Sequence, residues 1–292
     1  MNLIWQHLIT KRVIMALKHL LFISTCIFLI SCSSLNSNQK TTRDKKTDLY
    51  YGQGTEMLVK KEYSKALEYL LEAQKLSPKD SEIQNNLGMA YFFKKRWLKA
   101  KDHLTRAIEL DPQNSNARNN LASILFREKN YKEAKIQYQK VKEDLIYSHQ
   151  YRTYYNLALI SEAEGKTNEL IALLNESVAE REDFCPAHYK LGQVSLAQDK
   201  LSSAIKHFKN ASKGLCYKDP APLYYQAMIY QRLAAPQKAV GKLSEILSNF
   251  ENSGYSPKAK SSLEQIMKSN PELREQIQIT LDRLKKNAAE QL

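Results

Sequence analysis

The cysteines carry the clearest chemistry in this 292-residue chain. Cys26 and Cys32 lie within and just after an apolar stretch near the N-terminus, whereas Cys185 and Cys216 stand far downstream. The sequence has no glycine-rich phosphate loop, no HExxH or GxSxG motif and no paired CxxC, so no known catalytic motif is present. The six histidines are scattered. We therefore expect thiol chemistry rather than an enzyme, with no metal site and no cofactor.

The N-terminal stretch has the pattern of a signal peptide. Leu20–Ile30 is apolar or small, follows Lys18, and has no acidic residue before it,. About eleven residues at about 1.5 Å each cannot cross a hydrocarbon core of roughly 30 Å, which makes a permanent transmembrane helix the weaker interpretation. We expect residues 1–31 to be cleaved, and Met15 would begin a signal peptide of more ordinary length than Met1.

The apolar stretch ends in Leu29-Ile30-Ser31-Cys32, which resembles the bacterial lipobox. In lipoproteins with this motif the cysteine thiol is acylated and the preceding peptide is removed. The resemblance implies that Cys32 carries the lipid anchor. Two or three acyl chains would hold the protein firmly, since each buried methylene contributes about 0.8 kcal/mol. Ser33 and Ser34 follow, which by resemblance to Gram-negative sorting implies the outer membrane, with the chain facing the periplasm. The alternative is an ordinary secreted cysteine.

Residues 33–46 are almost entirely polar and cannot bury enough apolar surface to offset the entropy of folding,. We expect residues 32–46 to comprise the acylated cysteine and a disordered tether.

From residue 47 onward the sequence repeats itself. Gly88, Ala100 and Leu104 recur 34 positions earlier as Gly54, Ala66 and Leu70. The repeats are expected to start near Thr47, Ser81, Ser115, Tyr151, Cys185 and Pro220. This pattern resembles the tetratricopeptide repeat (TPR), whose period is also 34 residues. The resemblance implies an all-α superhelical solenoid of six helix-turn-helix repeats over residues 47–252, in which small residues let the two helices of a repeat approach closely.

Beyond Ser253 the period is lost. Asn270-Pro271 predicts a helix start, with Asn270 as the cap and proline at the first helical position. An apolar stripe follows, formed by Leu273, Ile277, Leu281 and Leu284,. Because a solenoid needs its open end covered, we expect residues 253–292 to form capping helices.

In TPR proteins the first helix of each repeat lines a groove that binds partner segments. The positions that face it are Glu82, Asn85, Met89, Phe92 and Phe93, then Asn116, Asn119, Ser123, Phe126 and Arg127, then Arg152, Tyr155 and Leu159. Of these we expect partner contacts from Asn85, Met89, Phe92, Phe93, Asn119, Phe126, Arg127 and Tyr155. Exposed aromatic residues would form an apolar patch of the kind that marks partner sites. The alternative is that the aromatic twelfth positions pack between repeats. We interpret the sixth-position asparagines, among them Asn120 and Asn156, as structural.

Cys185 and Cys216 are expected to form a disulfide. They are the thiols left once the signal peptide is removed and Cys32 is acylated, in an oxidising compartment. Since the helices of a TPR are antiparallel, the start of the first helix lies beside the end of the second, where these two cysteines fall. The alternative is two buried thiols that behave as small hydrophobic side chains.

The formal net charge of +13 becomes +10 once Lys11, Arg12 and Lys18 are removed with the signal peptide. Basic surfaces can bind nucleic acid, but an exported lipoprotein is not expected to meet any. An acidic partner or anionic lipid is the more natural counterpart.

A signal peptide, a lipobox, a short tether and six TPRs resemble the pilotin lipoproteins of type IV pili, the PilF/PilW/Tgl family. That resemblance implies a scaffold that binds an outer-membrane secretin subunit and assists secretin assembly. The alternative is a general periplasmic adaptor for peptidoglycan or other envelope enzymes. An enzyme or carbohydrate-binding lipoprotein is a more remote possibility.

Overall fold

The computed structural model describes residues 41–213 and 216–289, with side chains described as far as residue 282. The signal peptide, Cys32 and residues 33–40 of the expected tether lie outside this part. The described residues are helical and contain no strand, so the expected all-α TPR solenoid fold is confirmed. The chain divides into two compact units, residues 1–78 and residues 79–292.

The first unit contains one helix pair, α2 (Thr42–Val59) and α3 (Tyr63–Leu76). Helix α2 starts five residues before the expected repeat start at Thr47, so the assignment of residues 42–46 to a disordered tether is wrong. Thr41 and Asp44 form a reciprocal capping box, in which each side chain accepts a hydrogen bond from the other residue's backbone N–H,. The Arg43 guanidinium also donates to the carbonyl of Leu76. These contacts extend the helix into a segment whose composition alone suggests disorder.

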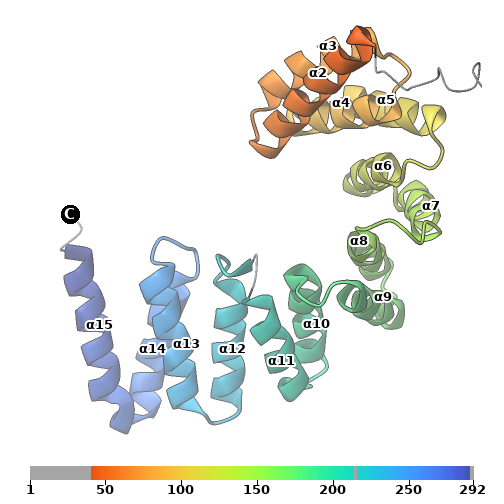
Figure 1. Ribbon diagram of the computed structural model, residues 1–292. Helices are drawn as coiled ribbons and strands as arrows, with labels where there is room; N and C mark the ends of the chain where they lie inside the picture. Colours follow the sequence, from red (N-terminus) through yellow and green to blue (C-terminus); the bar gives the residue numbers. More distant parts are fainter. Residues whose placement is uncertain (1–40, 214–215, 290–292) are drawn as a thin grey trace, which may run out of the picture. The chain divides into compact units, whose positions relative to one another are not determined.

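The second unit contains five further helix pairs, coloured from yellow to blue in Figure 1. The first helices of these pairs are α4 (Ser81–Phe93), α6 (Ser115–Arg127), α8 (Gln150–Ala163), α10 (Cys185–Ala197) and α12 (Ala221–Arg232). Their partners are α5 (Trp97–Leu110), α7 (Tyr131–Lys142), α9 (Thr167–Glu180), α11 (Leu201–Ala211) and α13 (Pro236–Asn249). Each helix packs mainly against its chain neighbours, as in other TPR solenoids,.

The close approach of paired helices depends on the small residue at the eighth position of each repeat. A Cβ atom on Gly88 would lie 2.6 Å from Cγ of Leu104, well inside van der Waals contact. Gly192 has the same relation to Phe208. Ala100, Leu104 and the corresponding residues of the other pairs are fully buried. The period seen in the sequence is therefore the period of this helix-to-helix contact.

The turn within each repeat places its fifteenth residue in the left-handed region. In the second repeat this residue is Lys95, with φ of 58°. The N–H of Arg96 donates to the carbonyl of Tyr91 and the N–H of Lys95 to that of Phe92, which is the Schellman pattern,. Only the fourth repeat has glycine there, Gly165. The other repeats tolerate a conformation that is unfavourable for residues with a Cβ.

The C-terminal region consists of α14 (Ser256–Ser269), the short 3₁₀ helix η2 (Pro271–Leu273) and α15 (Arg274–Ala289). Leu263, Leu273 and Ile277 join one buried cluster with Leu243 of α13. Asn270 occupies the N-cap position and Pro271 the first position of η2, as the sequence predicts, but the Asn270 side chain makes no capping hydrogen bond. Its side-chain amide instead donates to the carbonyl of Ile266 and closes α14, and a 3₁₀ turn precedes α15.

Candidate protein-binding site

A pocket of about 360 Å³ opens between the first helices of three consecutive repeats in the second unit. Helices α4, α6 and α8 line it, together with the residue that precedes α10. The lining residues are Met89, Phe92, Asn119, Asn120, Ser123, Arg152, Tyr155, Asn156 and Phe184. We call this cavity the Asn119 pocket. The eighth- and twentieth-position contacts fix the two helices of each pair, and the first helices of successive pairs then line one cavity.

The walls of the Asn119 pocket are aromatic and apolar. The Phe92 ring packs edge-on against Trp97, with ring centroids 5.2 Å apart. On the opposite wall Tyr155 packs edge-on against Phe184 at 5.4 Å. Met89 lies beside them and is only half-buried. These contacts fix the rings in place, so the pocket can accept an apolar side chain with little further ordering.

One polar group in the pocket lacks a partner. Asn119 is 7% exposed, and its Oδ1 accepts no hydrogen bond among the described residues. The adjacent Asn120 is satisfied, because its Nδ2 donates to Oδ1 of Asn85 at 2.9 Å. Buried polar groups in proteins are nearly always paired, and an unpaired one costs about 1–3 kcal/mol. The Asn119 amide therefore forms part of the pocket wall, and no described residue donates a hydrogen bond to its enclosed Oδ1.

Two further polar side chains of the pocket, Ser123 and Asn156, both hydrogen-bond the buried hydroxyl of Tyr138. The hydroxyls of Ser123 and Tyr138 lie 2.9 Å apart, and Asn156 also hydrogen-bonds Tyr138. Burial raises the pKa of Tyr138, and burial also raises the pKa of Tyr155, with Glu162 adding to the effect. Both phenols thus stay neutral at physiological pH and act only as hydrogen-bonding groups.

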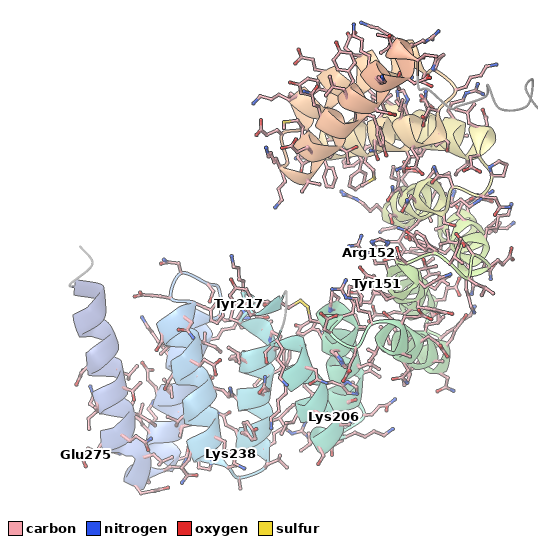
Figure 2. The ribbon with its side chains drawn as sticks, viewed as in Figure 1. Tyr151, Arg152, Lys206, Tyr217, Lys238 and Glu275 are labelled. Atoms are coloured by element: carbon pink, nitrogen blue, oxygen red, sulfur yellow. A yellow bond between two sulfur atoms is a disulfide. The ribbon has the colours of Figure 1, made fainter. Side chains whose placement is uncertain are left out.

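Two arginines supply positive charge at the pocket. Arg152, labelled in Figure 2 at the start of α8, lines the cavity and is exposed; its guanidinium lies 5.5 Å from the ring centroid of Tyr151. Arg127 stacks over the rings of Trp97 and Phe92, at 4.7 and 5.4 Å. Within the described residues neither arginine forms an ion pair with a carboxylate. The local field is therefore positive and unneutralised.

The residues expected to face a partner take several different places. Met89, Phe92, Asn119 and Tyr155 line the pocket. Arg127 and Phe93 do not line the cavity. Arg127 lies over the ring of Phe92, and the side chain of Phe93 is 44% exposed. Asn85 is buried and bound to Asn120.

Phe126 packs against Tyr131 within the cluster shared by α6, α7 and α8. The alternative interpretation, in which twelfth-position rings pack between helices, thus describes Phe126. It also describes part of the surface of Phe92.

Sequence reasoning missed Phe184 and treated Asn120 and Asn156 as purely structural. Phe184 lies in the connection before α10 and not on any first helix, so counting positions from a repeat start could not include it. A signal did exist, since a large aromatic residue directly before a helix start needs a packing surface. Asn120 and Asn156 combine a structural hydrogen bond with a place in the pocket wall.

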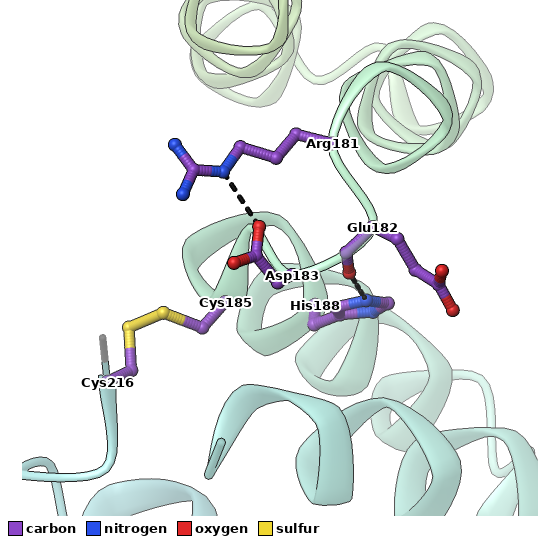
Figure 3. The surroundings of a disulfide bond; sticks show 6 residues. All are labelled: Arg181, Glu182, Asp183, Cys185, His188 and Cys216. Atoms are coloured by element: carbon purple, nitrogen blue, oxygen red, sulfur yellow. Dashed lines mark hydrogen bonds and ion pairs between the residues drawn. A yellow bond between two sulfur atoms is a disulfide. The ribbon is translucent and has the colours of Figure 1, made fainter. Parts of the chain in front are cut away.

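The disulfide expected between Cys185 and Cys216 is present, and Figure 3 shows its surroundings. The two Cα atoms are 6.1 Å apart, within the range that a disulfide requires. Cys185 is the first residue of α10, and Cys216 lies in the connection between α11 and α12. Beside the bridge, Arg181 pairs with Asp183, and Nε2 of His188 lies 2.9 Å from the carbonyl oxygen of Glu182. The disulfide therefore ties the start of the fifth repeat to its end.

The described residues contain no group of three or more side chains suited to hold a metal ion. Within the same part of the chain, no helix is both long enough and apolar enough to span a membrane.

Comparison with known proteins agrees with this fold. Residues 81–114 and 103–136 each match a tetratricopeptide repeat model. The sequence matches no curated protein. These findings, with the helix pairs described above, define a TPR protein.

Among solved structures, the chain is similar to PilF of Pseudomonas aeruginosa, with a TM-score of 0.67 and 16% identity over 76% of this chain and 100% of that one. It is also similar to PilW, a widely conserved type IV pilus biogenesis factor, with a TM-score of 0.62 and 22% identity over 71% of this chain and 95% of that one. At these identities the similarity establishes the fold.

Proposed function

We propose that this chain is a lipid-anchored TPR scaffold of the cell envelope that binds a partner protein through the Asn119 pocket. In this proposal the partner is an outer-membrane secretin subunit, and the chain acts as a pilotin in type IV pilus biogenesis. The observation that carries the proposal is the match of the helix array to almost the whole length of PilF and PilW. The pocket, with its aromatic rings and an exposed arginine, supplies a surface suited to a protein segment,.

The membrane part of the proposal depends on the lipobox-like sequence that ends at Cys32. Acyl chains on this cysteine would hold the protein at the periplasmic face of the outer membrane. The described part of the chain begins at Thr41, the cap of α2. Residues 33–40 would therefore connect the lipid to the first repeat, at most about 3.5 Å per residue if extended.

Site-specific photocrosslinking in native envelopes tests this function. A photoreactive amino acid replaces Met89 at the pocket, and a control replaces Leu98, which is 75% exposed on α5 and does not line the pocket. We expect the variant at position 89 to crosslink to a secretin subunit and the variant at position 98 not to do so. Crosslinks from position 89 only to peptidoglycan enzymes would favour a general envelope adaptor. Equal crosslinking from both positions would contradict the pocket as the binding site.

A further inference from the structure

We propose that the connection between α7 and α8, residues 143–149, contacts the phospholipid bilayer and inserts Leu145 and Ile146 into its headgroup region. We call this connection the 143–149 loop. The inference rests on the membrane part of the proposed function, because two apolar side chains alone would hold a protein at a bilayer only weakly. For an anchored chain, the same contact would fix how the second unit lies on the membrane.

The apolar part of the 143–149 loop is almost fully exposed. Leu145 and Ile146 are 92% and 93% exposed, more than any other large apolar side chain that the structure describes. Single exposed apolar residues are ordinary on protein surfaces, but these two are adjacent in one loop. Since they bury so little surface within the chain, they contribute little to folding. Their burial awaits a surface outside the chain.

Hydrogen bonds at the base of the 143–149 loop hold it in shape. Nε2 of buried Gln150 donates to the carbonyls of Val141 and Asp144. The Asp144 carboxylate accepts from the hydroxyl of Ser115 at 2.6 Å and from the backbone N–H of Ile146 at 3.2 Å. The exposure of the apolar side chains therefore belongs to an internally bonded loop, whose base already satisfies these polar groups.

The charges around the 143–149 loop favour an anionic lipid surface. Lys140 and Lys142 are exposed in the last turn of α7, and neither forms an ion pair within the described residues. Arg152 is exposed in the first turn of α8. The acids of the loop are Glu143 and Asp144, and the Asp144 carboxylate is already engaged. Lysine side chains can lay their alkyl stems beside inserted apolar groups and keep their ammonium groups among phosphates.

The shape of the 143–149 loop also fits a bilayer better than a protein. Two adjacent side chains that project from a loop require a matching cavity in a protein partner, whereas a fluid interface accommodates them without one. Tyr147 and His149 follow in the chain, half-buried, with ring centroids 5.6 Å apart. Tyrosine is enriched where an apolar core meets lipid headgroups, because its ring is apolar and its hydroxyl polar.

The anchor supplies the proximity that the 143–149 loop lacks by itself. In the proposed function, acyl chains on Cys32 and the connecting residues 33–40 keep the folded chain at the membrane. Such confinement raises the effective concentration of the bilayer near the loop, so that a weak second contact becomes populated. Attachment would still depend on Cys32, and the loop would determine orientation.

Tryptophan fluorescence in lipid vesicles tests this contact. The natural protein and its variants are purified from envelopes in detergent, transferred to vesicles that contain phosphatidylglycerol, and isolated by flotation. Leu145→Trp reports on the loop. Leu233→Trp is the control, because Leu233 is 46% exposed where α12 ends, in the turn within a repeat. The emission of the natural chain, which contains Trp97, is subtracted. We expect the added tryptophan of Leu145→Trp, and not that of Leu233→Trp, to emit at shorter wavelength and to be quenched by lipids with brominated acyl chains.

Removal of two lysines tests the charge part. In the Leu145→Trp protein, Lys140→Gln with Lys142→Gln should weaken loop insertion about fivefold per lysine and about 25-fold in all at low salt. The effect should be small on phosphatidylcholine alone. The control pair is Lys206→Gln with Lys209→Gln, two exposed lysines of α11, of which Lys206 is labelled in Figure 2. This pair should leave insertion unchanged. Circular dichroism melting first establishes that all variants are equally folded.

The outcomes separate this inference from the proposed function. Natural protein that does not float with the vesicles would contradict the anchor, and this inference with it. Protein that floats while Leu145→Trp stays unquenched would overturn the inference alone. An emission shift without quenching by brominated lipid would mean that a protein surface, such as a second copy of the chain, covers the loop. Equal quenching at both positions, or equal effects of the two lysine pairs, would also overturn the inference.

Discussion

Two neighbouring asparagines of the pocket differ in their hydrogen bonding. Asn119 leaves its Oδ1 unpaired in the pocket, whereas Asn120 donates to Asn85. Replacing Asn119 by leucine removes an unsatisfied buried polar group, and we expect the free energy of unfolding to rise by up to about 1 kcal/mol.

The matched variant Asn120→Leu should do the reverse to stability. It leaves Oδ1 of Asn85 without its donor, and we expect a loss of about 1–2 kcal/mol,. Urea unfolding of both variants provides the measurement. If Asn119→Leu destabilised the fold as much as Asn120→Leu does, the Asn119 amide would be structural.

Two of the phenylalanines first expected in the groove should differ in their effect on stability. Phe126 packs against Tyr131 in a buried cluster, whereas Phe93 is 44% exposed. We expect Phe126→Ser to cost about 2–4 kcal/mol of unfolding free energy, slightly below the range for a fully buried ring, and Phe93→Ser to cost under about 1 kcal/mol. Denaturant melts of the single variants give the values. A small loss of unfolding free energy for Phe126→Ser would contradict its packing role and favour a partner contact instead.

At the scale of the element, most turns inside the repeats hold a non-glycine residue in the left-handed conformation. Lys95 has φ of 58° at the C′ position of α4, where glycine is the preferred residue,. Lys95→Gly should stabilise the protein by about 1 kcal/mol, because the left-handed conformation costs a residue with Cβ roughly that amount. Lys94→Gly is the control, since Lys94 has φ of −79°, and glycine there should be destabilising. Thermal melts of the two variants should therefore shift in opposite directions; a fall in both would contradict the strain.

The fifth repeat adds a covalent constraint to its helix pair. The loop-entropy model gives about 3–4 kcal/mol for a disulfide that closes a loop of this length, with a sequence separation of 31,. We expect the double variant Cys185→Ala, Cys216→Ala to lose about that much stability. The natural protein should lose a similar amount on reduction. Unreduced peptide mapping by mass spectrometry should find the linked pair. Two thiols free to alkylation in the exported, unreduced protein would mean that the bridge does not form.

The sequence predicted the helix pairs well because one contact recurs in each of them. Small residues such as Gly88 and Ala122 must sit opposite a large residue of the second helix, so spacing alone reveals the pairing. The pocket was less predictable. Asn119 and Asn120 are identical residues in adjacent positions, and only the three-dimensional arrangement decides which has a partner. The start of α2 was missed because a single capping box, formed by Thr41, outweighs the polar composition around it.

At the scale of the whole molecule, the proposed function requires both the pocket and the membrane anchor. The Asn119 pocket lies in the second unit, on residues between 89 and 184, and the lipobox-like sequence that ends at Cys32 precedes α2 in the chain. In the proposed function the acyl chains confine the protein to the membrane in which its partner assembles. Confinement raises the effective concentration of a pocket whose own contact area is small. Binding of an isolated peptide should therefore be weak compared with capture of a partner at the membrane.

The role of Cys32 can be tested independently of the pocket. If this thiol is acylated, Cys32→Ser removes the acceptor, and we expect the protein to lose its label with a fatty-acid analogue and to leave the membrane fraction. One acyl chain alone gives only marginal membrane binding, so loss of the cysteine that carries several chains should release the protein almost completely. Cys26→Ser is the matched control, because Cys26 lies inside the apolar stretch that we expect to be removed with the signal peptide. That variant should be labelled and membrane-bound like the natural protein. Binding of the partner protein by purified Cys32→Ser should be unchanged, since this variant leaves the pocket residues as they are. Fatty-acid label that persists on Cys32→Ser would place the lipid elsewhere and refute this anchor.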